Sequence, residues 1–147
     1  MKSNSLRFRA VVLLFWIVLA GCGSNSPFKY VKVSGKIGYE DGTPIPIGGM
    51  ELRFTALDAP KLEKAYPRPG VARVNEKGQF ERVTSYKFGD GLIPGRHKVS
   101  IDLGNGPDTK PLVPKEYTSA ATTPLVVDTA DSPFTIKVPK PKAISKP

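Results

Sequence analysis

The dominant pattern along the chain is an alternation of apolar and polar residues. In Val31–Tyr39 the apolar residues stand at odd-numbered positions, whereas Lys32, Ser34 and Lys36 occupy even-numbered ones. Met50–Ala56 repeats the alternation with the apolar residues at even-numbered positions. Because successive side chains of a strand point to opposite faces, this period of two predicts strands with one buried face and one face in water.

Five further strands are predicted from the same alternation. They are Val71–Asn75, Gln79–Val83, His97–Leu103, Leu125–Asp128 and Phe134–Val138. The third and fourth strands are expected to form a hairpin over residues 76–78, because Gly78 accepts a positive φ. Arg82 breaks the expected inward alternation from Phe80, which puts the register of its strand in question.

Seven short strands with turns between them, and no segment of convincing helical periodicity, favour an all-β fold. The expected architecture is an antiparallel seven-stranded β-sandwich. The chain has 147 residues and one cysteine, so the sandwich is expected to fold without a disulfide and to depend on its core for stability.

The N-terminus has the layout of a signal peptide. Lys2, Arg7 and Arg9 precede an unbroken apolar run from Ala10 to Leu19. A bilayer core needs about 20 apolar residues in a helix, so this run is too short for a permanent transmembrane segment. The segment is therefore expected to direct export and to be removed.

The next four residues, Leu19-Ala20-Gly21-Cys22, resemble the lipobox of bacterial lipoproteins at every position. The resemblance implies that the Cys22 thiol receives a diacylglycerol and that signal peptidase cuts after Gly21. Two or three fatty chains, such as palmitate, anchor a protein stably, whereas one does so only marginally. Ordinary cleavage that leaves Cys22 as a free thiol is the alternative. Gly23 favours the outer membrane if the envelope has two membranes.

Four regions follow from these predictions. Residues 1–21 form the lipoprotein signal peptide, and 22–29 the lipidated cysteine with a flexible tether. Residues 30–138 form the β-sandwich domain. The segment 139–147 alternates proline with lysine and is expected to be a disordered tail.

The chain is strongly basic, with a net charge of +9. Three of the positive residues belong to the predicted signal peptide, so +6 remains after its removal. An exported basic protein is expected to meet anionic lipid head groups or acidic envelope polymers rather than nucleic acid. The alternative is that the charge serves only solubility.

The order of several motifs resembles transthyretin-like, carboxypeptidase-regulatory-like domains, also described as prealbumin-like. The matching segments are Val33–Tyr39, Asp41–Ile45, Leu52–Phe54, Asn75–Phe80, Gly89–Val99 and Pro114–Thr118 with Pro124–Val127. One enzymatic branch of that group hydrolyses 5-hydroxyisourate with more than one histidine and a C-terminal Tyr-Arg-Gly-Ser. This chain has one histidine and ends Ile-Ser-Lys-Pro, so no enzymatic activity is expected.

The presence of only one histidine also limits catalytic and metal chemistry. His97, the single histidine, is expected to be a partly buried packing residue, and zinc lacks a set of ligands. No cofactor is expected. Several aspartates near turns could be considered for calcium, but they form no Asp-x-Asp-x-Asp run and are better explained as solvated turn residues. These aspartates are Asp90, Asp102, Asp108, Asp128 and Asp131.

Surface aromatic residues beside cations are the remaining candidates for recognition. Tyr66 with Arg68, and Tyr86-Lys87-Phe88, are the candidate ligand contacts, unless their rings cover the ends of the sandwich. Two functions stay open. The first is a non-enzymatic envelope lipoprotein whose sandwich is a structural module or binds another envelope protein. The second is a module that binds carbohydrate or another envelope polymer.

Overall fold

A computed structural model describes residues 26, 28–60, 62, 65–104 and 111–141. The described chain is mostly sheet, with two short 3-10 helices. The strands are β1 (Gly35–Tyr39), β2 (Glu51–Ala56), β3 (Gly70–Arg73), β4 (Gln79–Phe80), β5 (Arg96–Asp102), β6 (Val126–Asp128) and β7 (Phe134–Val138). The 3-10 helices are η1 (Lys115–Thr118) and η2 (Thr129–Asp131).

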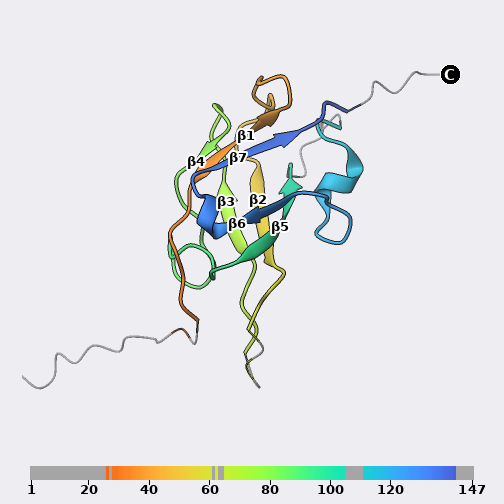
Figure 1. Cartoon of the computed structure of the whole chain (residues 1–147). Helices are drawn as coiled ribbons and strands as arrows, with labels where there is room; N and C mark the ends of the chain where they lie inside the picture. The colour runs from red at the N-terminus through yellow and green to blue at the C-terminus, as the bar shows by residue number, and fades with distance from the viewer. Residues whose placement is uncertain (1–25, 27, 61, 63–64, 105–110, 142–147) are drawn as a thin grey trace, which may run out of the picture.

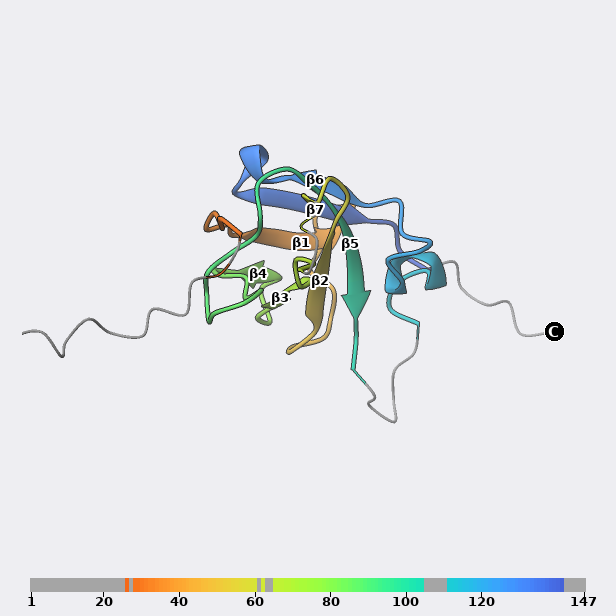
Figure 2. The ribbon, with the colours of Figure 1, turned by 90° about the horizontal axis from the view of Figure 1, so that it is seen from below.

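The strands form two sheets that enclose one apolar core (Figures 1 and 2). One sheet has the order β4-β1-β7 and the other has the order β3-β2-β5-β6. The prediction of an all-β fold with two packed sheets is therefore confirmed. Within the described residues, no helix has both the length and the apolar character that crossing a bilayer requires.

The prediction that all the strands are antiparallel is wrong, because β1 and β7 are parallel. Their register runs from Gly35 opposite Phe134 to Tyr39 opposite Val138. Alternation of side chains is the same in parallel and antiparallel strands, so the pattern could not distinguish them. Gly35 permits this pairing: a Cβ there would lie 2.7 Å from the carbonyl oxygen of Phe134, closer than real Cβ atoms approach.

The predicted β3–β4 hairpin is also wrong, although its turn is present. The turn closes with the Asn75 N–H donating to the Gln79 carbonyl (2.9 Å), and Gly78 has a φ of +76°. Beyond the turn the two strands join different sheets, since β4 pairs with β1 and β3 pairs with β2. The chain then crosses back to β3 at a bridge between Val71 and Thr84.

This crossing explains why Arg82 is out of phase. The predicted strand Gln79–Val83 is regular only as far as Phe80, after which Glu81 and Arg82 are both exposed. Phe80 and Val83 are both buried, three positions apart, so the alternation is interrupted between them. The interruption is where the backbone leaves one sheet for the other.

The first predicted strand is shorter than expected. Regular pairing begins at Gly35, and Val31 instead forms an isolated bridge with Leu92 in two backbone hydrogen bonds of 2.8 and 3.0 Å. The other strands agree with prediction to within one or two residues at each end. The observed bounds in those cases are Glu51–Ala56, Gly70–Arg73, Arg96–Asp102, Val126–Asp128 and Phe134–Val138.

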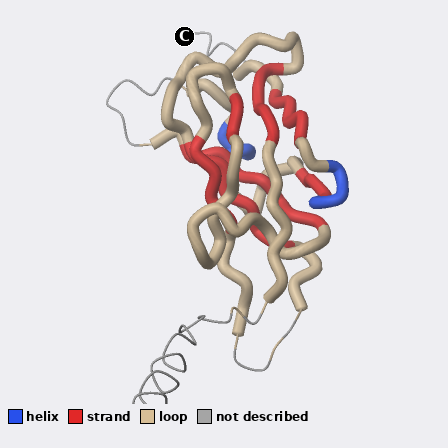
Figure 3. Tube along the Cα trace, turned by 90° about the vertical axis from the view of Figure 1, so that its left-hand side faces the viewer, coloured by secondary structure: helices blue, strands red, loops and turns tan. Residues whose placement is uncertain are grey.

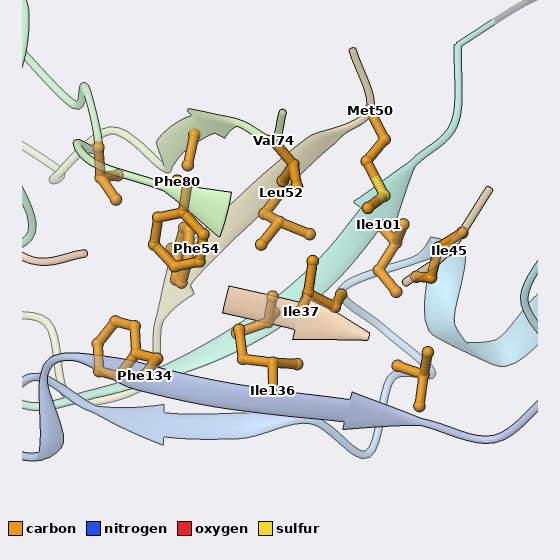
Figure 4. Close-up of a cluster of buried hydrophobic side chains, with 14 of the residues drawn as sticks. Ile37, Ile45, Met50, Leu52, Phe54, Val74, Phe80, Ile101, Phe134 and Ile136 are labelled. Carbon is orange, nitrogen blue, oxygen red and sulfur yellow. The ribbon is translucent and has the colours of Figure 1, made fainter. Parts of the chain in front are cut away.

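The core is built from the inward faces of both sheets (Figure 4). Phe54 on β2 meets Phe80 and Phe134 of the other sheet, with ring centroids 5.9 and 6.1 Å apart. Ile37 and Leu52 extend the contact between the layers beside these rings. The alternation in the sequence thus supplies one apolar face from each sheet, and the two faces bury each other.

The described N-terminal residues are packed onto the domain. Phe28, within the segment expected to be a tether, is only 9% exposed, and Val31 is paired with Leu92. At the other end of the chain, the ammonium of Lys140 binds the carboxylate of Asp41 and holds the pKa of that carboxyl well below its usual value. Ordered contacts therefore extend beyond residues 30–138 in both directions.

Candidate functional site

One candidate site is a groove of about 530 Å³ lined by residues of β2, β3 and β4 and of the loop that follows β4. Because β3 and β4 belong to different sheets, the wall of the groove combines residues from both sheets. Phe80 and Phe88 contribute rings to its wall. The charged residues of the wall are Glu51, Arg73, Glu81 and Arg82.

Each arginine of the groove is paired with a carboxylate at the surface. Nε of Arg73 lies 3.2 Å from Oε1 of Glu51, and a terminal nitrogen of Arg82 lies 3.7 Å from Oε2 of Glu81. Exposed pairs of this kind contribute only about 0–1 kcal/mol. Both guanidinium groups can therefore exchange a carboxylate of the protein for an anionic group of a ligand at small cost.

Phe88 stands at the rim of the groove with an unusual degree of exposure. Its side chain is 80% exposed, and the guanidinium carbon of Arg82 lies 5.2 Å from its ring centroid. Phe88 therefore presents an apolar ring face, and the cation of Arg82 lies next to it. This combination suits a ligand that has both an apolar face and a negative charge.

The loop that carries Phe88 is held in shape by Asp90. The Asp90 carboxylate accepts the backbone N–H groups of Ser85 (2.8 Å), Tyr86 (3.0 Å) and Lys87 (2.8 Å). Three backbone donors on one carboxylate order the loop without a ligand present. Asp90, which we expected to be a solvated turn residue, is therefore the organising residue of this loop.

The candidate contacts from the sequence do not form a single platform. Arg68 lies over the ring of Tyr86, 5.6 Å from its centroid, so these two residues are brought together. Phe88 lines the groove, whereas Tyr66, Arg68 and Tyr86 do not. Tyr66 is 82% exposed on the connection between β2 and β3, and Lys87 is exposed beside Phe88.

Sequence reasoning missed the arginines of the groove. Arg73 and Arg82 reach it only because β3 and β4 separate into different sheets, which the expected hairpin did not allow for. The one available signal was the position of Arg82 out of phase with Phe80. Because the alternation of buried and exposed residues is interrupted there, Arg82 is exposed next to the exposed ring of Phe88.

His97 is buried, as expected, and lies on β5. It is 2% exposed, and its Nδ1 donates to the carbonyl of Gly95 (3.0 Å). Burial disfavours the charged imidazolium and lowers the pKa of His97 below its ordinary value, with the Gly95 carbonyl partly opposing that shift. His97 is therefore held inside the protein, where its charged form is disfavoured, and it does not line the groove.

Two of the other aspartates considered for calcium, Asp102 and Asp128, have structural roles. Asp128 caps η2 by accepting the Ala130 N–H (3.0 Å), and Asp102 accepts the N–H of Gly104 (3.0 Å). Asp108 lies outside the described residues. Among the residues that are described, His, Cys, Asp and Glu side chains nowhere gather in a group of three or more that could hold a metal ion.

The predicted signal-peptidase and lipidation residues Leu19, Ala20, Gly21 and Cys22 lie outside the described residues. Comparison with protein-family models, with curated proteins and with solved structures finds no match to this chain.

Proposed function

We propose that this chain is a lipid-anchored protein of a bacterial cell envelope, and that its transthyretin-like β-sandwich is a non-enzymatic structural or interaction module. The observation that carries the proposal is Leu19-Ala20-Gly21-Cys22 directly after a short apolar run. Small residues before a cysteine suit cleavage there, and the thiol is the nucleophile that accepts the lipid. The outer membrane is the proposed location if the envelope has two membranes.

The described domain begins close in sequence to the proposed anchor position. Phe28, six positions after Cys22 (28 − 22 = 6), is already buried in the fold. A fully extended chain spans about 3.3–3.6 Å per residue, so the domain begins within roughly 20 Å of the lipidated sulfur. A sandwich held this close to a membrane is placed to contact other components of that surface.

A non-enzymatic role is supported by the state of the one histidine. A hydroxyl nucleophile needs a base within hydrogen-bond reach, and histidine is the usual one. His97 is buried with its Nδ1 occupied by a backbone carbonyl, so it is not available to a substrate in the groove.

The experiment that tests the anchor is fractionation of cells that express the full chain or its Cys22→Ala variant. We expect the unaltered chain in the membrane fraction, labelled when the cells are fed a tagged fatty acid, and the variant without label. Ser24→Ala is the matched control and should behave as the unaltered chain. A Cys22→Ala variant that still carried the label would contradict the proposal.

A second candidate function, binding of an acidic envelope polysaccharide, is favoured by the groove. Phe88 offers a ring face on which a sugar can stack, while Arg82 and Arg73 are placed to meet its carboxylate or phosphate groups. Such binding should weaken with salt, because exposed charges are screened.

Binding of polygalacturonate, with uncharged dextran for comparison, tests this candidate. Phe88→Ala and Arg82→Ala should each weaken binding of the acidic polymer severalfold. Arg53→Ala is the matched control, because Arg53 is an exposed arginine on β2 outside the groove. Equal binding by all three variants, or equal binding of dextran, would refute a groove-specific interaction.

A further inference from the structure

The described residues of the connection between β2 and β3, which are 57–60, 62 and 65–69, expose several large apolar side chains. Leu57 is 43% exposed, Leu62 is 41% exposed and Tyr66 is 82% exposed. Three large apolar side chains exposed on one connection make it a candidate contact surface.

The position of this connection identifies the surface. Figures 1 and 3 show it at the same end of the domain as the described N-terminal residues. The connection between β1 and β2 projects from the opposite end (Figure 1). Since Phe28 is packed into the fold six residues after Cys22, an anchor at Cys22 holds this end, and not the opposite one, next to the membrane.

The charge of the described residues at this end also suits an anionic lipid surface. Arg68 and Lys29 are both exposed. Asp58 is neutralised by Arg96, whose Nε and a terminal nitrogen donate to its two carboxylate oxygens at 2.9 and 3.2 Å. Basic residues next to an anionic bilayer are attracted to it, and tyrosine is enriched where hydrocarbon meets the head groups.

We propose that the connection between β2 and β3 contacts the bilayer beside the lipid anchor, with Leu62 and Tyr66 entering the head-group region and Arg68 meeting anionic lipid. This inference rests on the proposed anchoring at Cys22 for its orientation. It assigns Tyr66 to the membrane and leaves Phe88 to the groove. The domain is then held by the lipid and by a second, protein-made contact, which limits how it rotates on its tether.

The test uses tryptophan fluorescence, because Trp16 is the only tryptophan and lies in the predicted signal peptide. The chain from Cys22 to Pro147 keeps every described strand and core residue. Its single cysteine is coupled to a maleimide lipid in vesicles of phosphatidylcholine with phosphatidylglycerol. Tyr66→Trp reports on the proposed contact. Tyr117→Trp is the matched control, since η1 lies away from this end (Figure 1).

We expect the emission of the Tyr66→Trp variant to shift to shorter wavelength on coupling and to be quenched by brominated lipid. The Tyr117→Trp variant should show neither effect. Adding Arg68→Gln should reduce the quenching in anionic vesicles, whereas Arg53→Gln should not. Circular dichroism of each uncoupled variant confirms that the fold is kept.

Equal quenching of both reporters, or no quenching of either, would overturn the inference. The result does not depend on lipidation in the cell, because maleimide coupling replaces it. Failure of fatty-acid labelling at Cys22 would count against anchoring in the cell, while quenching of the Tyr66→Trp variant would still show that this end of the domain can contact a bilayer. Failure of the fluorescence test would count against the membrane contact alone.

Discussion

Replacing Phe54 with alanine removes the ring at the centre of the core. Phe54 has no exposed surface and contacts Phe80 and Phe134 of the opposite sheet at centroid distances of 5.9 and 6.1 Å. A buried phenylalanine replaced by alanine costs about 3–5 kcal/mol, from lost burial and the cavity left behind. A domain of about 110 residues has an unfolding entropy near 0.23 kcal/mol/K, so Tm should fall by roughly 13–22 °C.

Differential scanning calorimetry of the Phe54→Ala variant measures this change directly. Phe88→Ala is the control, because it makes the same chemical change at a side chain that is 80% exposed. Surface substitutions usually alter stability by about 0.5 kcal/mol or less, which amounts to about 2 °C here. Equal falls in Tm for the two variants would refute the placement of Phe54 between the sheets.

Three further predictions address the strand pairing, the loop and the buried histidine. Gly35→Ala should destabilise the domain by about 1–3 kcal/mol in urea unfolding, because the added Cβ would clash with the β7 backbone. Gly48→Ala is the control and should not destabilise the domain, because the added Cβ would meet only the flexible side chain of Glu76. Asp90→Ala should speed amide hydrogen exchange at residues 85–87, and unchanged rates would refute its organising role. Because burial lowers the pKa of His97 in the folded state, its contribution to stability is present above its unfolded value of 6.5 and is lost as pH falls toward the folded pKa. The free energy of unfolding should therefore depend less on pH between about 7 and 5 in His97→Gln than in the unaltered protein.

The strands were predictable from sequence because burial on one face leaves a period of two. Phe134–Val138 matches prediction at both ends, since each inward residue of β7 is buried and each outward one exposed. The partners of the strands were not predictable. Gly35 pairs with Phe134 from the other end of the domain, and nothing local in either segment specifies a parallel neighbour.

The candidate site was predictable only where it depends on single exposed residues. Phe88 and Tyr66 stand out in sequence as aromatic residues beside cations, and both prove to be exposed. The groove was not predicted, because it depends on β3 and β4 lying in different sheets, whereas the sequence around their turn predicts a single hairpin. Arg82 was visible as an anomaly of register, and its position in the groove depends on the crossing of the chain between sheets.

The central claim is that lipid on Cys22 holds this sandwich at a membrane. Mass spectrometry of the N-terminal peptide of the protein purified from bacterial membranes tests it most directly. The account predicts a peptide that begins at Cys22 and carries a diacylglyceryl group on its sulfur. A peptide that began at another residue, or that contained Cys22 as a free thiol, would contradict it.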